Sequence, residues 1–209
     1  MNKQILILGP HTDDGEWGCG ASIAKWVEQG HTINYVAFSA AEESVPAGFS
    51  SDILRNEILD ASEVLGLSPN NVRVSKFKVR YFPRDRQDIL EEMIQLREEL
   101  KPEIVVVPSS YDTHQDHQVI SQESFRAFKR STILGYEIPW NNRQITLTFF
   151  NGVSEECLQK KVSALAAYKS QYFRAPNFKE LVMSLAIQRG SQVGLPFAEA
   201  FEVIRWVES

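Results

Sequence analysis

Two short segments gather the histidines and aspartates that are best suited to chemistry. These side chains are His11, Asp13 and Asp14 in "HTDD", and Asp112, His114, Asp116 and His117 in "DTHQDH". The chain has four histidines, and three of them fall in these two segments. The fourth, His31, opens an expected strand, where a packing or surface role is the simpler interpretation.

The spacing within each segment favours a shared metal ion. His11 and Asp14 are three residues apart, as are His114 and His117, so a loop or a first helical turn can aim both members of a pair one way. Two imidazoles and one carboxylate, with one position left for water, are typical of a catalytic zinc site. Ferrous iron and manganese accept the same ligands. The cation would also offset the repulsion between adjacent aspartates.

Two other interpretations of "HTDDGEWGCG" explain less. A dinucleotide-binding loop would use Gly18 and Gly20, but its third glycine would fall at Ile23, and the aspartates would repel a pyrophosphate. Helix capping explains one aspartate near a helix N-terminus, where its charge is worth about 0.3–1 kcal/mol. Capping does not explain a second aspartate, a histidine and a matching cluster elsewhere.

The elements that must position these side chains alternate along the chain. Apolar runs predict strands, and amphipathic segments predict helices. The expected strands are 4–9, 32–39, 72–77, 103–109, 133–138 and 144–150, and the expected helices are 21–30, 51–67, 86–102, 116–130 and 154–168. This alternation predicts a single α/β domain over residues 1–209, with a mainly parallel sheet and helices on both faces. In such folds ligands bind beyond the carboxyl ends of the strands, where both segments lie.

The composition excludes some classes of partner. With 22 Lys and Arg against 27 Asp and Glu, the net charge is −5, and no basic run offers a surface for nucleic acid. The two cysteines, Cys19 and Cys157, are expected to be buried free thiols. No segment has the roughly 18 apolar residues of a membrane span or the features of a signal peptide, so a cytoplasmic location is expected.

The two chemical segments also resemble those of a known family, the PIG-L/LmbE-type N-acetylglucosaminyl deacetylases. "PHTDDGEWGCGASIAKW" resembles their P-H-P-D-D segment, and "THQDHQVI" resembles their H-x-D-H motif. Weaker similarities, in the same order as in the family, cover nearly the whole chain. They are "RNEILDASEVLG" (55–66) to an R-x-E helix, "ALAAYKSQ" (164–171) to a Tyr-x-Ser-Gln segment, and "AEAFEV" (198–203) to a closing element.

The resemblance implies a Rossmann-like fold and a zinc-dependent hydrolase that removes the acetyl group from an N-acetylated amino sugar or a sugar conjugate. By motif position the metal ligands would be His11, Asp14 and His117. Asp13 would be the general base that activates a zinc-bound water. His114 would stabilise or protonate the tetrahedral intermediate, and Asp116 would orient His114.

The resemblance and local composition also suggest substrate contacts. Arg55 matches an arginine that contacts sugar hydroxyls, although a surface arginine is an equally good interpretation. Tyr111 lies near the second motif, where the family often has a tyrosine that binds the oxyanion. Trp140 and Asn141, in "YEIPWNN" (136–142), would pair an aromatic face with an amide, although a turn with a packed tryptophan is the alternative. The partner would be a small N-acetylated sugar, and a homo-oligomer stays open.

Departures from the family pattern leave other functions open. Thr12 and Gln115 stand where the family usually has proline, and Glu16, one residue late for the family's acidic position, has no assigned role. A non-haem iron oxygenase also uses two histidines and a carboxylate, but usually within antiparallel barrels. A non-catalytic sugar- or metal-binding module would be expected to lack the general base, whereas Asp13 is present.

Overall fold

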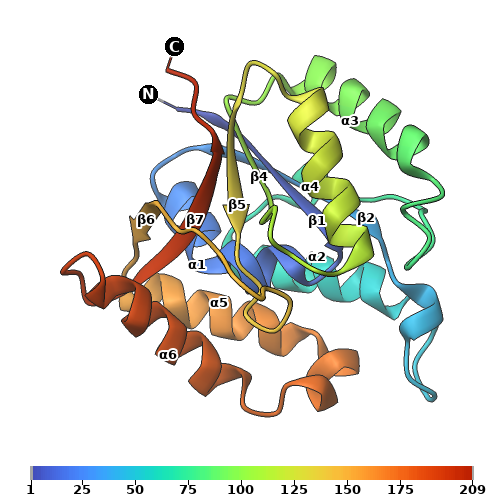
Figure 1. Cartoon of the computed structure of the whole chain (residues 1–209). Coiled ribbons are helices and arrows are strands. Elements are labelled where there is room, and N and C mark those ends of the chain that lie inside the picture. Colours follow the sequence, from blue (N-terminus) through green and yellow to red (C-terminus); the bar gives the residue numbers. More distant parts are fainter. Residues whose placement is uncertain (1, 209) are drawn as a thin grey trace.

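The structure, a computed structural model that describes residues 2–208, arranges strands and helices into one seven-stranded sheet with helices on both sides (Figure 1). The strands are β1 (Gln4–His11), β2 (Thr32–Ser39), β3 (Val72–Val74), β4 (Ile104–Pro108), β5 (Thr132–Tyr136), β6 (Phe149–Gly152) and β7 (Ala198–Arg205). The α-helices are α1 (Asp14–Glu28), α2 (Ile53–Leu65), α3 (Arg86–Leu100), α4 (Gln115–Ala127), α5 (Glu155–Ala167) and α6 (Phe178–Ser191). Short 3₁₀ turns are η1 (Glu42–Ser44), η2 (Pro69–Asn71) and η3 (Lys169–Arg174).

The order of the strands creates a switch point in the middle of the sheet. The order is β3-β2-β1-β4-β5-β7-β6, in which the first five strands are parallel and β7 is antiparallel to both of its neighbours. From β1 the chain builds outward to β3 and then returns to place β4 on the other side of β1. The loops after β1 and β4 therefore flank the position where an open α/β sheet binds its ligands. The predicted α/β class with a mainly parallel sheet is confirmed.

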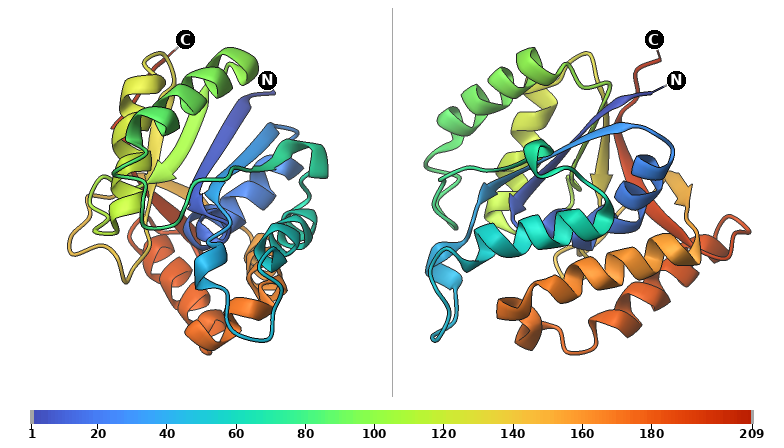
Figure 2. Two further views of the ribbon diagram at one scale, coloured as in Figure 1. Left: turned by 90° about the vertical axis from the view of Figure 1, so that its right-hand side faces the viewer. Right: turned by 180° about the vertical axis from the view of Figure 1, so that it is seen from behind.

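The core consists of two apolar layers, one on each face of the sheet. Because successive side chains on a strand point to opposite faces, Ile5 and Ile7 of β1 pack in the layer of α1, α2, α5 and α6. Leu6 and Leu8 pack in the layer of α3 and α4. Figure 2 shows these two groups of helices on either side of the sheet. The predicted cover of both faces is confirmed.

The largest difference from the sequence expectation is the start of the first helix, which is Asp14 rather than residue 21. The glycines of "DGEWGCG" disfavour a helix by their propensity. They lie, however, where there is no room for a side chain: an added Cβ would lie 2.6 Å from the Tyr35 ring at Gly15 and 2.2 Å from the Tyr136 ring at Gly18. Close packing of this helix on the sheet thus overrides local propensity.

Other boundaries also shift. The expected strand 144–150 begins only at Phe149, and the expected strand 72–77 keeps three residues. The segment after residue 168, which had no assignment, forms η3, α6 and β7. Cys19 and Cys157 are buried and unbridged, as expected.

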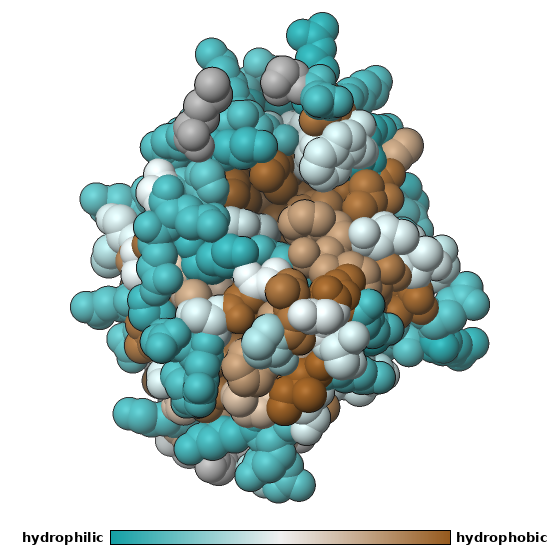
Figure 3. Space-filling model, turned by 90° about the vertical axis from the view of Figure 1, so that its left-hand side faces the viewer, coloured by the Kyte–Doolittle hydropathy of each residue, from teal (hydrophilic) through white to brown (hydrophobic). Residues whose placement is uncertain are grey.

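The surface that carries the β6 edge of the sheet mixes apolar patches with polar and charged side chains (Figure 3). Within residues 2–208, none of the helices has the length and apolar character needed to cross a bilayer.

Candidate metal and catalytic site

The three side chains expected to bind a metal meet at the switch point. His11 ends β1, Asp14 begins α1, and His117 lies in the first turn of α4. Oδ2 of Asp14 lies 3.1 Å from Nδ1 of His11 and 3.3 Å from Nε2 of His117. One ligand atom from each of these residues can be chosen so that all three lie within 4.8 Å of one another. The fold therefore brings together residues that are more than 100 positions apart in the sequence.

Carboxylates hold the far nitrogens of both imidazoles. Nδ1 of His117 lies 2.8 Å from Oδ2 of Asp112, and Nε2 of His11 lies 3.0 Å from Oδ2 of Asp116. In metal sites such contacts fix the orientation and tautomer of a histidine ligand. Here they leave the other nitrogen of each ring facing Asp14. Asp112, which had no role assigned from the sequence, is thus part of the site.

The charges at this centre fit a divalent cation. Burial would raise the pKa of Asp14, but His117 and His11 lower it to about 2. Burial would lower the pKa of His11, but the carboxylates of Asp14 and Asp116 raise it from 6.5 to about 10. A proton on His11 thus balances part of the negative charge when no cation does. Two imidazoles and a buried carboxylate are a donor set that suits zinc, ferrous iron or manganese.

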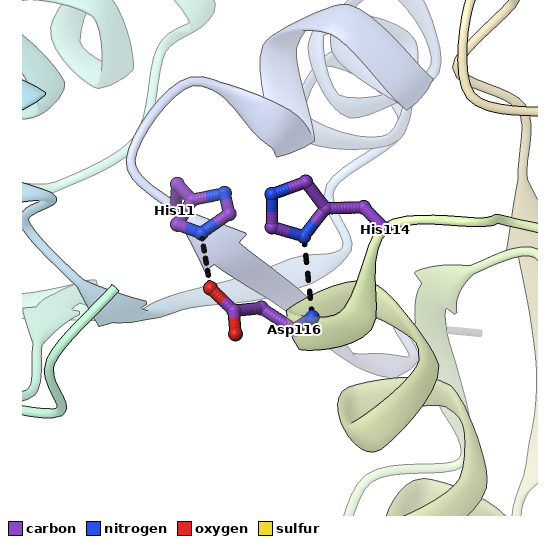
Figure 4. A group of neighbouring side chains, drawn as sticks. All are labelled: His11, His114 and Asp116. Atoms are coloured by element: carbon purple, nitrogen blue, oxygen red, sulfur yellow. Dashed lines mark hydrogen bonds and ion pairs between the residues drawn. The ribbon is translucent and has the colours of Figure 1, made fainter. Parts of the chain in front are cut away.

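His114 lies beside this centre, with its ring centroid 5.1 Å from that of His11 (Figure 4). Its Nδ1 accepts a hydrogen bond from the backbone N–H of Asp116 at 3.2 Å, so a neutral ring carries its proton on Nε2. Burial, together with the charges of His117 and His11, lowers the pKa of His114 below 6.5. Asp116 thus contacts the ring of His114 through its backbone N–H, while its carboxylate contacts His11 and the backbone N–H groups of Arg80 and Phe82.

Asp13 precedes α1 and lines the same cavity as His11, His114 and His117. It occupies the N-cap position, but its carboxylate makes no capping hydrogen bond to the helix. Helix capping, the alternative interpretation of this segment, therefore does not account for Asp13.

Glu16 acquires a structural role beneath the aspartate pair. It is fully buried, with the hydroxyls of Tyr35 and Tyr168 at 3.0 and 3.1 Å from its carboxyl oxygens. The same hydroxyls lie 2.8 and 2.6 Å from the carbonyl oxygen of Thr12. Burial raises the pKa of Glu16 to about 8, so the carboxyl is neutral at pH 7 and can itself donate a hydrogen bond. This network fixes the turn that carries Asp13.

The cavity above the centre has a volume of about 690 Å³. The rings of Trp17 and Trp140 meet edge to face on its wall, with centroids 4.9 Å apart, and Asn141 lies beside them. The carbonyl of Asn141 accepts hydrogen bonds from the backbone and hydroxyl of Thr113, which joins this loop to the second motif. Trp140 and Asn141 thus line the cavity, as a substrate-binding role requires.

Two other expected substrate contacts do not reach the cavity. The guanidinium of Arg55 donates to two backbone carbonyls beside β3 and pairs with Glu42. The hydroxyl of Tyr111 accepts a hydrogen bond from Thr146. Neither residue is among those that line the cavity, whereas Arg80, which the sequence did not single out, is.

A break in α1 positions Trp17. The helix is interrupted at Cys19, where φ is −150°. The Nζ of Lys161 donates to the carbonyl of Trp17 at 2.7 Å before the break, and Glu199 accepts from the backbone N–H of Ser22 at 2.6 Å after it. Lys161 and Glu199 are both buried and lie 2.6 Å apart. This ion pair therefore joins the two halves of the helix and fixes the segment that presents Trp17.

The fold and the site together define an α/β protein with a group of residues at its switch point that could hold a metal ion. The family model described as GlcNAc-PI de-N-acetylase, PIG-L, matches residues 6–128, and the chain belongs to this family.

Similar proteins include deacetylases. "Uncharacterized deacetylase YaiS" of Escherichia coli K12 is 31% identical over 173 residues, which are 80% of this chain and 91% of that protein. The N,N'-diacetylchitobiose deacetylase of Pyrococcus horikoshii superposes with a TM-score of 0.81 at 19% identity, over 97% of this chain and 84% of that one. GalB of Pseudomonas putida, a 4-carboxy-2-hydroxymuconate hydratase, gives a TM-score of 0.80 at 21% identity over 99% of each chain. The same fold thus also serves a different reaction, so the site must decide the function.

Proposed function

We propose that this protein is a zinc-dependent hydrolase that removes the acetyl group from an N-acetylated amino sugar or a conjugate of one. The observation that carries the proposal is the convergence of His11, Asp14 and His117. In each imidazole the nitrogen that faces away from Asp14 contacts a carboxylate. Membership of a deacetylase family and deacetylase relatives support the reaction class.

His11, Asp14 and His117 would hold the metal through Nδ1, a carboxylate oxygen and Nε2. A second group, His11, His114 and Asp116, also has ligand atoms within 4.8 Å of one another. The carboxylate of Asp116 already accepts two backbone N–H groups, however, which makes this second set the poorer one. A bound zinc ion acts as a Lewis acid toward the amide carbonyl and lowers the pKa of a water.

The protein's own residues would handle the protons. Asp13 accepts the proton of the water as its oxygen adds to the acetyl carbon, and returns it to the sugar nitrogen. The Nε2–H of neutral His114 donates to the developing oxyanion. Breaking the C–N bond then gives acetic acid and the amine, and transfer of the acid's proton to the amine leaves acetate and an ammonium group, so that atoms and charge balance. Trp17, Trp140 and Asn141 would hold the sugar ring in the cavity.

The test is release of acetate and amine from a panel of N-acetylated amino sugars, nucleotide sugars and sugar conjugates. The protein is stripped with a chelator and reloaded with zinc, ferrous iron or manganese. We expect activity to vanish on stripping and to return with metal. Full activity in excess chelator would contradict the proposal. Oxygen uptake with ferrous iron would favour an oxygenase, and sugar binding without any turnover would favour a binding module.

A further inference from the structure

We infer that the cavity contains an anion subsite built on Arg80, so that the preferred substrate carries a carboxylate or a phosphate in addition to its acetamide. The acetamide of this substrate rests on the proposed function, and the anionic group is the new element. The shared chemistry of the two groups is an oxyanion that a guanidinium can bind with two parallel hydrogen bonds.

The first observation is the position of Arg80 in the cavity. Among the lining residues whose side chains the structure describes, Arg80 is the only arginine or lysine. The remaining lining residues are the aspartates and histidines of the candidate metal and catalytic site, apolar and aromatic side chains, and polar groups that include the amides of Asn141 and Gln171. With about 690 Å³, the cavity lies within the range of sites for drug-sized ligands, and it has room for a sugar and a substituent.

The second observation is how firmly the backbone of Arg80 is held. Its N–H donates to Oδ2 of Asp116 at 2.6 Å, the same oxygen that lies 3.0 Å from Nε2 of His11. The side chains of Val79, directly before it, and Phe82, two residues after it, are buried, whereas that of Tyr81 is exposed. The Asp116 carboxylate therefore fixes the backbone of Arg80 relative to the candidate metal site. The point from which the side chain of Arg80 extends is fixed as well.

The backbone conformation of Arg80 is a third observation. Its φ is +72°, in the left-handed region that residues with a β-carbon rarely adopt. A glycine would adopt this conformation without strain, yet the position carries a long cationic side chain. The shape of the turn that contacts Asp116 therefore does not explain why residue 80 is an arginine. A role for the arginine side chain does explain it.

The fourth observation concerns the partners of the guanidinium. Its Nη2 donates to the hydroxyl of Ser44 at 3.0 Å. No carboxylate among the described residues forms an ion pair with it, whereas Arg55 pairs with Glu42 and Arg84 pairs with Asp85. A cation that lines a ligand cavity and has only a neutral partner is suited to an anionic group of the ligand.

The experiment measures binding by calorimetry to the zinc-loaded protein. The probes are neutral N-acetylglucosamine, its 1-phosphate and 6-phosphate, and N-acetylmuramic acid, which carries a carboxylate. The variants are Arg80→Gln and Arg80→Lys, and the control is Arg84→Gln, an exposed arginine outside the cavity. Asp116 contacts the backbone and not the side chain of residue 80. Both Arg80 variants should therefore keep the metal content and the circular dichroism spectrum of the wild type.

We expect at least one anionic probe to bind the wild type at least tenfold more tightly than the neutral sugar, and less tightly at high salt. Arg80→Gln should weaken that probe by about 10- to 100-fold, the range for a lost hydrogen bond to a charged group, and should leave the neutral sugar unchanged. Arg80→Lys should recover part of the loss, and Arg84→Gln should have no effect. The phosphate and carboxylate probes identify which anion is preferred.

Equal affinities for neutral and anionic probes would overturn the subsite, as would an equal loss of both in Arg80→Gln. Acetate release is scored separately in each mixture. Arg80-dependent binding without acetate release from any probe would contradict the proposed function and support the subsite. Acetate release that depends neither on Arg80 nor on the charge of the probe would support the proposed function and contradict the subsite.

Discussion

The carboxylate of Asp112 lies 2.8 Å from Nδ1 of His117, and both side chains are almost completely buried. The contact places the ring proton on Nδ1 and leaves the lone pair of Nε2 toward Asp14, 3.3 Å away. Asp112 also accepts the backbone N–H of His114 at 2.8 Å. A residue outside the ligand set thus controls both histidines of the second motif.

Replacing Asp112 with asparagine should weaken zinc binding by about 10- to 100-fold, because the amide is a poorer acceptor for the Nδ1 proton. Competition with a chromophoric chelator measures the affinity. Asp88→Asn, an exposed position in the first turn of α3, is the matched control and should bind zinc like the wild type. Wild-type affinity in Asp112→Asn would remove the role assigned to this contact.

The assignment of Asp13 as general base predicts a separation between binding and turnover. Asp13→Asn should retain the metal and lose about 10²- to 10⁴-fold in kcat, whereas His117→Ala should lose metal and activity together. Metal content by atomic emission and acetate release are measured on the same samples. Near-normal turnover in Asp13→Asn, or retained metal in His117→Ala, would show that the roles are misassigned.

Zinc binding should release protons at pH 7. The pKa of His11 is raised to about 10 in the metal-free protein, so its ring is protonated and must lose a proton before it can bind the metal. Zinc affinity should therefore increase as the pH rises toward that value. Calorimetry in two buffers of different ionisation enthalpy should give at least about one proton released per zinc ion. Zinc binding without proton release would mean that His11 is neutral or is not a ligand.

Glu16 should make the stability of the metal-free protein depend on pH. Its folded pKa, about 8, lies above the ordinary 4.5, so its contribution is fully present below about pH 4.5. The contribution is lost as the pH rises toward 8, because the unfolded carboxyl ionises while the buried one stays protonated. The free energy of unfolding of the wild type, relative to Glu16→Gln, should fall by a few kcal/mol over this window. Urea unfolding at several pH values in chelator tests this, and a difference independent of pH would contradict it.

The buried pair at the break in α1 should matter far more than a neighbouring surface pair. Lys161→Met leaves Glu199 buried without its cation and should cost about 3–5 kcal/mol of unfolding free energy. Lys160→Met, which removes the exposed pair with Glu28, should cost less than about 1 kcal/mol. Urea unfolding compares the two variants. Equal costs would show that the pair does not hold the broken helix.

The sequence predicts the centre well because it depends on topology. Carboxyl ends of parallel strands share one edge of a sheet, so segments after β1 and β4 must meet, and His11 and His117 do. Contacts that depend on the orientation of a ring or on a loop are harder to predict. Asp112 stands in the second motif, but its partner follows from the rotamer of His117, and Arg80 reaches the site only because the backbone of its loop wraps Asp116.

The position of Arg55 outside the cavity lining has a physical reason as well. An arginine on an amphipathic helix can reach a cavity or nearby backbone carbonyls, and the side chain of Arg55 takes the carbonyls beside β3. Sequence spacing does not distinguish these outcomes, because they differ by side-chain torsions. The early start of α1 does not follow from the sequence, because the close contact of Gly15 and Gly18 with tyrosine rings is a property of the packed sheet.

The claim on which the account depends is that the loops after β1 and β4 hold one divalent ion. The most direct measurement is an anomalous difference map at the zinc absorption edge from crystals of the zinc-loaded protein. We predict one strong peak at about 2.0–2.2 Å from Nδ1 of His11, a carboxylate oxygen of Asp14 and Nε2 of His117. A map with no peak there, or with its main peak on other residues, would contradict the account.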